Sequence, residues 1–263
     1  MQPDFINIIG GLGRMGALMA RIFSHAGQSV RVFDSRLQTF SWEDAADADV
    51  VLAAVPIPAF EEVMANLGPH TRPGGVVIDV ASLKEKPVEI MLRHCRGEVI
   101  GAHPLFGPAV ASLQDQLIFL CPAKTEKWLD WFKNFLEGLG ASTMVIGAAG
   151  HDKLMSRVQV LRHLFLFCFG RSLMRLEFDL EKETPLSGPW FSQLLGLLDH
   201  QLEQSPELYA DLALHNPSAR QVYDEFAQAA GEVAGSFMSG DRDRIINLIN
   251  EVTTYLRPSQ SVA

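Results

Sequence analysis

The sequence of 263 residues has little basic charge, little cysteine and no long apolar run. Its 22 Lys and Arg residues face 31 Asp and Glu residues, which gives a formal charge of -9. Proteins that bind nucleic acid neutralise phosphates with a concentrated Lys and Arg surface, so this composition excludes nucleic acid as a partner. A small anionic ligand would need local positive potential against the overall negative field.

Cysteines are few and far apart. Cys95, Cys121 and Cys168 form no CxxC pair, so we expect neither a metal site nor a redox centre, and reduced thiols in a cytoplasmic protein are the simplest interpretation. The longest charge-free apolar stretch, Leu164 to Gly170, is far shorter than the roughly 20 residues that span a membrane. The N-terminus has no basic leader and no cleavage-like end, so we expect no signal peptide and no membrane association.

Disorder is excluded because 48% of the residues are hydrophobic and only 20% are charged. From residue 5 to about 145, short apolar runs rich in β-branched residues alternate with longer amphipathic segments, which predicts βαβ units and a mainly parallel sheet covered by helices. The predicted strands are Phe5 to Ile9, Ser29 to Phe33, Val50 to Val55, Gly75 to Val80, Glu98 to Ala102, Leu117 to Cys121 and Ser142 to Ile146. Helices are predicted at Met15 to Ala26 and Ala59 to Leu67.

The periodicity becomes helical after Gly150, which predicts an α/β domain of the Rossmann dinucleotide-binding type at 1–147 and an all-α domain at 148–263. Asp241 to Leu256 is predicted to be the last helix, and Arg257 to Ala263 a frayed tail. Prolines mark helix starts or breaks at Pro185, Pro189, Pro206 and Pro217.

A glycine-rich turn joins the first predicted strand to the first helix. In Gly11-Leu12-Gly13-Arg14-Met15-Gly16, the glycines allow a tight turn, close approach of a pyrophosphate and packing of the helix on the strand. An unrelated tight turn is the alternative, but the strand before and the helix after favour a dinucleotide site. We therefore assign all six residues to cofactor binding.

Asp34 ends the second strand, where a carboxylate can bind the adenosine ribose. A carboxylate repels the 2′-phosphate of NADP, so Asp34 favours NAD, although Arg36 lies close by. Val55 and Pro56 end the third strand in a loop that either runs beneath the cofactor or is an ordinary proline-rich strand exit.

Two segments that follow strands carry reactive groups. Asp79-Val-Ala-Ser82-Leu-Lys84 and Gly101-Ala-His103-Pro104 would both lie at the carboxyl edge of the sheet, where open α/β folds bind ligands. The imidazole of His103 can accept a proton near neutral pH, and the hydroxyl of Ser82 could orient it. A histidine bonded to backbone at the end of a strand is the alternative.

These residues resemble the prephenate and arogenate dehydrogenase family, and most of all the dehydrogenase half of the bifunctional chorismate mutase-prephenate dehydrogenases, the T-proteins. The resemblance covers nearly the whole chain, and HPLFGP paired with DVASLK is its most specific part. The matching segments are GGLGRMG, AVPI, DVASLK, GAHPLFGP, HDKLMSRVQVLRHLF and PELYADL.

The resemblance implies NAD-dependent oxidative decarboxylation of prephenate to 4-hydroxyphenylpyruvate. His103 would accept the proton of the 4-hydroxyl as hydride leaves, and Ser82 would hold His103 and touch the nicotinamide. His163 would line the substrate pocket, although a packed helix histidine is the alternative, and Gln159 one turn earlier faces the same way. We also assign Lys84 to substrate binding.

One position departs from the family pattern. Where the enteric enzymes carry an arginine for the ring carboxylate of the substrate, an ungapped alignment places His200. Histidine lacks the permanent bidentate charge of arginine, so either His200 is protonated by the ligand, or Arg162 or Arg220 substitutes, or the substrate is a relative of prephenate. That relative would be 4-amino-4-deoxyprephenate, oxidised to 4-aminophenylpyruvate.

Other functions remain open. A 3-hydroxy-acid or imine-reducing dehydrogenase would use a lysine such as Lys153, and a non-catalytic NAD-binding regulator would need neither Ser82 nor His103. The chain starts at its first dinucleotide strand, so we expect no chorismate mutase segment. The family also dimerises through its helical domain, and the apolar helices between Val158 and Leu198 fit a homodimer.

Overall fold

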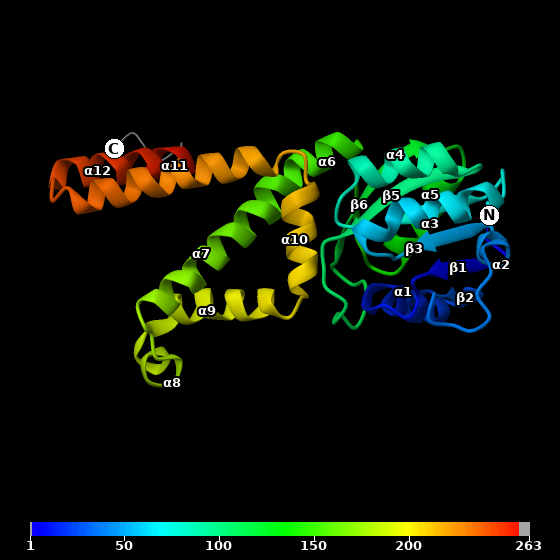
Figure 1. Cartoon of the computed structure of the whole chain (residues 1–263), viewed down its shortest axis with the longest axis horizontal. Helices are drawn as coiled ribbons and strands as arrows, with labels where there is room; N and C mark the ends of the chain where they lie inside the picture. The colour runs from blue at the N-terminus through cyan, green and yellow to red at the C-terminus, as the bar shows by residue number, and fades with distance from the viewer. Residues whose placement is uncertain (1, 258–263) are drawn as a thin grey trace. The chain divides into compact units, whose positions relative to one another are not determined.

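The computed structural model describes residues 2–257, which divide into two compact units, one that ends at Pro217 and one that begins at Ser218. The first unit holds a seven-stranded sheet and ten helical segments with their short turns (Figure 1). The second unit holds the last two helices.

The sheet has the strand order β2-β1-β3-β4-β5-β6-β7. All neighbouring strands are parallel except β5 and β6, which are antiparallel, so the predicted mainly parallel sheet is confirmed. All seven predicted strands are present: β1 (Ile6–Ile9), β2 (Val30–Phe33), β3 (Val50–Ala53), β4 (Val76–Asp79), β5 (Glu98–Pro104), β6 (Leu117–Lys124) and β7 (Ser142–Val145).

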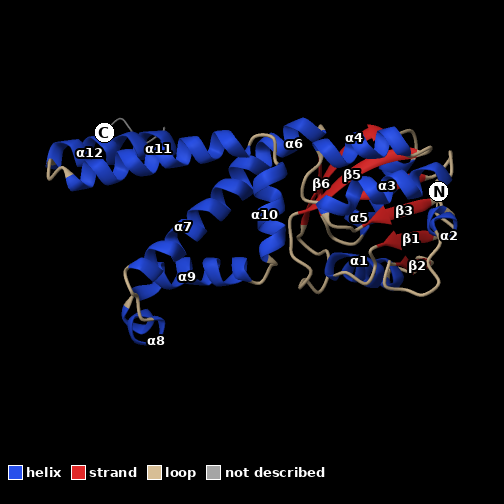
Figure 2. Cartoon of the chain, in the orientation of Figure 1, coloured by secondary structure: helices blue, strands red, loops and turns tan. Residues whose placement is uncertain are grey.

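Helices cover both faces of this sheet (Figure 2). Alternate residues of each strand point to opposite faces. In β3, Val50 and Leu52 therefore belong to one core and Val51 and Ala53 to the other. The first core is closed by α1 (Arg14–His25) and α5 (Trp128–Gly138), the second by α2 (Trp42–Ala46), α3 (Phe60–Leu67) and α4 (Glu85–His94), with the short turns η1 (Ile57–Ala59) and η2 (Gly68–His70) around α3.

A long interrupted helix leads out of the sheet. It consists of α6 (Ala148–Met155), a π-helical turn η3 (Ser156–Val160) and α7 (Leu161–Arg175). Gly147, where we predicted the domain boundary, is the N-cap of α6. The unit ends with α8 (Leu180–Glu183), η4 (Thr184–Leu186), α9 (Gly188–Leu202) and α10 (Pro206–His215).

Proline positions agree with the predicted helix starts. Pro185, Pro189 and Pro206 lie in the first turns of η4, α9 and α10, where a missing N–H costs nothing, and Pro217 lies between two helices.

The second unit is a helical hairpin of α11 (Ala219–Met238) and α12 (Arg242–Leu256). Asp241 caps α12 by accepting hydrogen bonds from the N–H groups of Asp243 and Arg244, so the predicted last helix is confirmed. Of the predicted tail, only Arg257 belongs to the described residues, and 258–263 lie outside them. Among residues 2–257, no helix has both the length and the apolar content that crossing a membrane requires.

Candidate active site

The carboxyl edges of β4 and β5 open onto a cavity of about 240 Å³. Ser82 follows β4 and His103 lies near the end of β5, so two parallel neighbours bring them to one edge. The opposite wall comes from η3, α7, α9 and α10 of the same unit. Among the predicted site residues, the structure brings these together around the cavity: Met15, Ser82, His103, Gln159, His163 and His200.

The imidazole of His103 is 2% exposed. Its Nδ1 lies 2.8 Å from Nε2 of His151, and its Nε2 lies 3.4 Å from Nε2 of Gln159. Burial, followed by the electrostatic interaction with His151 and with Lys84, holds the pKa of His103 well below its ordinary value. The ring is therefore neutral at pH 7 and can accept a proton.

Ser82 does not orient His103 as we predicted. Both residues line the cavity, but in the described part of the chain the two ring nitrogens of His103 face His151 and Gln159 instead. The physical reason is that His151 already fills the hydrogen-bonding position at Nδ1. The other predicted role of Ser82, contact with the nicotinamide, stays a prediction.

His151 and Asp152 form a buried pair in the middle of α6, 0% and 1% exposed. Nδ1 of His151 lies 2.8 Å from Oδ1 of Asp152, whose two oxygens accept the N–H groups of Lys84 and Glu85 at the start of α4. We predicted no role for this pair from the sequence, although it opens the matching segment HDKLMS. A His-Asp dipeptide in a helix was the signal that could have identified it.

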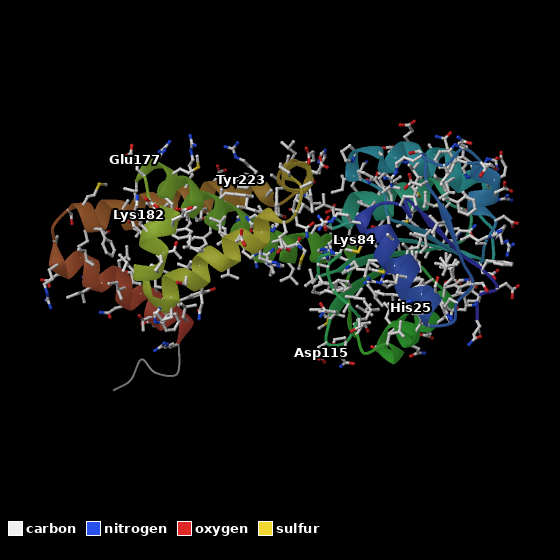
Figure 3. All side chains as sticks on the ribbon, turned by 90° about the horizontal axis from the view of Figure 1, so that it is seen from below. His25, Lys84, Asp115, Glu177, Lys182 and Tyr223 are labelled. Carbon is white, nitrogen blue, oxygen red and sulfur yellow. The ribbon has the colours of Figure 1, made fainter. Side chains whose placement is uncertain are left out.

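Lys84 does not reach the cavity, so its predicted contact with substrate is wrong in this structure. The side chain, labelled in Figure 3, is fully buried. Its ammonium contacts Oδ1 of Asp79 and donates to the carbonyl of Ala102 at 2.7 Å. The turn after β4 folds Lys84 back over the sheet, which explains the burial. Burial raises the pKa of Asp79 to about 6 against the lowering effect of Lys84.

The helical wall carries the cationic part of the cavity. The His163 ring lies edge-on to Tyr209 with centroids 4.8 Å apart, and its Nε2 lies 3.0 Å from Nη2 of Arg162. Because an arginine only donates, Nε2 of His163 accepts here. Burial, and then the charge of Arg162, lowers the pKa of His163 to about 4.

His200 lines the same cavity, but its side chain is 76% exposed and its Nδ1 lies 3.3 Å from Glu203. Of the described residues that line the cavity, Arg162 alone has a permanent charge. Arg220 belongs to the second unit, where it pairs with Asp224 at 2.9 Å.

The glycine-rich turn is built as the fingerprint requires. Gly10 adopts a φ of +72°, which favours glycine, and a Cβ at Gly16 would meet the backbone of Gly10 and Gly11. Gly13 is the N-cap of α1, so the first N–H groups of that helix are directed at the turn. Arg14 donates to the carbonyl of Glu203 at 3.0 Å, and Leu12 is exposed.

A second cavity of about 310 Å³ lies beside this turn. Predicted cofactor residues that line it are Gly13, Asp34, Val55 and Pro56. The carboxylate of Asp34 accepts the N–H of Leu12 at 3.1 Å and both Nε and Nη2 of Arg36, at 2.7 and 2.9 Å. These bonds, that of the Arg36 side chain first, lower the pKa of Asp34 to about 2.

The turn, the carboxylate and the cavity together fit a dinucleotide, with phosphates at the helix N-terminus and a ribose at Asp34. Met15, the second residue of α1, lines the other cavity with His103, so both cavities border this turn. Among the described residues, no group of three His, Cys, Asp or Glu side chains is placed to hold a metal ion. Lys153 is exposed and lines neither cavity.

Two family models match consecutive parts of the chain. One describes the nucleotide-binding domain of prephenate dehydrogenase and matches residues 22–145; the other describes its dimerization domain and matches residues 147–251.

Curated relatives agree with these matches. A T-protein of Enterobacter agglomerans is 31% identical over 93% of this chain and 65% of its own length. A 4-amino-4-deoxyprephenate dehydrogenase of Streptomyces pristinaespiralis is 25% identical over 93% of this chain and 88% of its own length. The chain spans only 60 to 66% of the length of the curated relatives that are 29 to 31% identical to it.

The crystal structure of a prephenate dehydrogenase from A. aeolicus, in complex with hydroxyphenyl propionate and NAD+, has the same fold. It superimposes with a TM-score of 0.76 at 20% identity and covers 98% of both chains.

Proposed function

This chain belongs to the prephenate dehydrogenase family, and on that premise we propose that it oxidises prephenate with NAD to 4-hydroxyphenylpyruvate, CO2 and NADH. The observation that carries the proposal is the position of His103. Its imidazole is neutral, buried and directed at a cavity that meets the glycine-rich turn at Met15.

NAD is the cofactor that fits Asp34. The ionised carboxylate can accept hydrogen bonds from ribose hydroxyls, whereas it would repel the 2′-phosphate of NADP. Arg36 does not offset this preference while its guanidinium is bonded to the same carboxylate. The bound nicotinamide would take up the hydride.

Aromatisation of the ring supplies the driving force, so the protein mainly has to align the substrate with the nicotinamide and provide one proton acceptor. As hydride leaves the ring carbon that bears the hydroxyl, Nε2 of His103 accepts the hydroxyl proton and a ring carbonyl forms. Loss of CO2 then returns an electron pair to the ring, and His103 returns the proton to the oxygen. Arg162 holds a carboxylate of the substrate, while His163, Gln159 and His200 line the rest of the pocket.

A second candidate substrate is 4-amino-4-deoxyprephenate. Two points favour it: the family resemblance places His200 where an arginine is expected, and a relative of that name is 25% identical to this chain. An ammonium group at the reacting carbon would have to lose a proton before hydride transfer, and neutral His103 suits that step as well.

We further propose that residues 148–263 form the substrate-binding and dimerisation domain and that a second copy covers its apolar surface. The helices after residue 148 expose large apolar side chains in both units, which a soluble monomer rarely does in such number. In the first unit these include Phe165, Phe167, Met174, Trp190, Leu197 and Leu202, and in the second Phe237, Met238, Ile249, Val252, Tyr255 and Leu256. The three free cysteines favour a reducing compartment, and we place the protein in the cytoplasm.

The test is turnover of prephenate and of its amino analogue by the purified chain, followed by NADH absorbance and product identification. We expect a higher kcat/KM with prephenate. His103→Asn should lower kcat by roughly 10²-fold to 10⁴-fold, while NAD binding persists. The matched control is His25→Asn at the exposed end of α1, which should keep full activity (Figure 3). Turnover of the amino analogue alone would refute the choice of prephenate, and turnover of neither would refute the substrate class.

A further inference from the structure

Three buried side chains form a continuous hydrogen-bonded series behind the cavity, which we call the triad: His103, His151 and Asp152. Two contacts of 2.8 Å join them, from Nδ1 of His103 to Nε2 of His151, and from Nδ1 of His151 to Oδ1 of Asp152. Of the three, only His103 lines the cavity. The other two cannot touch a substrate there, so their effect on the reaction must pass through His103.

Asp152, the member of the triad farthest from the cavity, determines which nitrogen of each histidine donates a hydrogen bond. Both oxygens of Asp152 accept backbone N–H groups, Oδ1 from Lys84 at 2.8 Å and Oδ2 from Glu85 at 2.9 Å. A backbone N–H only donates, so the carboxylate acts as an acceptor, and Nδ1 of His151 carries the proton that it donates to Oδ1. In a neutral imidazole the other nitrogen then has a free lone pair, so Nε2 of His151 accepts.

The tautomer of His103 follows in the same way. Because Nε2 of His151 accepts, Nδ1 of His103 must carry a proton and donate it. The free lone pair of His103 is then on Nε2, the atom that faces Gln159. The amide of Gln159 can donate to this nitrogen and hold it in place until substrate enters.

We propose that His151 and Asp152 are positioning residues, which keep His103 in the tautomer whose Nε2 accepts the substrate proton. The inference rests on the proposed function for the identity of that proton. Once His103 has accepted it, the triad places the carboxylate of Asp152 two hydrogen bonds away from the new positive charge. In hydrolases that use a Ser-His-Asp triad, a carboxylate fixes the tautomer of the catalytic histidine in the same manner.

Several charged or titratable groups face His103, and the triad has to act against some of them. The Lys84 ammonium lies between β4 and β5 and opposes a second positive charge nearby, and its effect on His103 is in the same direction as burial. The groups that act on His103 directly are His151 of α6 and Lys84 of the turn after β4, and behind them lie Asp152, bonded to His151, and Asp79 of β4, in contact with Lys84.

Replacement of His151 tests the proposal in the whole chain. His151→Leu removes the acceptor for Nδ1 of His103, so we expect kcat to fall by roughly 10² or more with the KM values for substrate and NAD nearly unchanged. His151→Gln offers an amide oxygen as acceptor and should recover a large part of that loss. His25→Leu is the control for an exposed histidine. Equal kcat values for the leucine and glutamine variants, or a change in KM alone, would overturn the proposal.

Nitrogen-15 NMR of histidine side chains in the unsubstituted protein provides a readout that does not depend on turnover. In both His103 and His151 the proton should be on Nδ1, and His103 in the His151→Leu protein should lose that preference. A proton on Nε2 of His103 in the resting protein would refute the triad even if prephenate is oxidised. If prephenate is not oxidised, the proposed function fails, whereas the NMR result still decides the tautomer.

Discussion

Replacement of Lys84 by methionine should destabilise the protein in a pH-dependent way. Lys84 is fully buried, contacts Asp79 and donates to the carbonyl of Ala102. Removing one partner of a buried ion pair leaves an uncompensated charge and costs about 3 to 5 kcal/mol. At pH 7.5 we therefore expect Lys84→Met to lower the free energy of unfolding by about that amount.

The pH dependence follows from Asp79, whose pKa rises from 3.8 to about 6 on folding. A raised acid pKa means that the folded state is penalised once the carboxylate ionises, here by about 3 kcal/mol at about 1.4 kcal/mol per pH unit. This loss of stability occurs between pH 4 and 6 in the unsubstituted protein, and it extends to higher pH when Lys84 no longer lowers that pKa. At pH 4 the carboxyl is protonated in the folded state and about half protonated in the unfolded state, so most of this penalty is absent and the lost bond to Ala102, about 1 to 3 kcal/mol, dominates.

Urea unfolding at pH 4 and pH 7.5 measures both values. Lys86→Met is the matched control, because its exposed pair with Glu89 at 3.2 Å is worth less than about 1 kcal/mol. The double variant Lys84→Met, Asp79→Leu should recover most of the loss at pH 7.5, since a well-packed apolar pair can replace a buried ion pair. Equal destabilisation at the two pH values would refute the reasoning. A higher KM with unchanged stability would restore Lys84 as a substrate ligand.

Four further predictions concern the two cavities and the core. Arg162→Met should raise the KM for prephenate by roughly tenfold or more, since a charged hydrogen bond is worth about 1.5 to 3 kcal/mol. The KM for NAD should stay constant. Initial-rate measurements test this, and an unchanged KM for prephenate would exclude Arg162 as the carboxylate ligand. His200→Arg should lower that KM if position 200 faces the carboxylate, and no effect would show that it does not. Asp34→Asn should raise the KM for NAD and reduce the preference for NAD over NADP, as rates with both cofactors would reveal; an unaltered preference contradicts the ribose assignment. Phe23→Ala should lower the free energy of unfolding by about 3 to 5 kcal/mol, as urea unfolding measures, because this ring of α1 is completely buried in the first core. A decrease below about 1 kcal/mol would mean that the core repacks.

The sheet could be predicted from sequence because its central strands, β1, β3, β4 and β5, are buried on both faces. The run Val50-Val-Leu-Ala53 has no polar alternation, which is typical of a parallel strand covered by helices. The position of Ser82 and His103 at one edge followed from the same reasoning, since parallel neighbours end together. These inferences need only local patterns and the rules of sheet topology.

The surroundings of His103 could not be predicted in this way. His151 lies 48 residues further along the chain, and its contact with His103 depends on how α6 packs against the sheet. Lys84 was misassigned because lysine is rarely fully buried, and only the fold of the turn after β4 brings its ammonium onto Asp79. The π-helical turn at Ser156–Val160 also has no glycine or proline to mark it.

That π-helical turn separates the number of residues in the helix from the direction in which α7 presents its side chains. A π turn holds one residue more than an α turn, whereas each residue of a regular α-helix advances the direction of a side chain by about 100°. Deletion of the exposed Val158 would let the segment relax into a regular α-helix. Because the extra residue is held within a single turn, the residues that follow, with Arg162 and His163 among them, should continue to face the cavity. The helix can therefore lose one residue at this turn and still offer the same side chains to the cavity, whereas the same loss in a regular helix would turn all later side chains by about 100°.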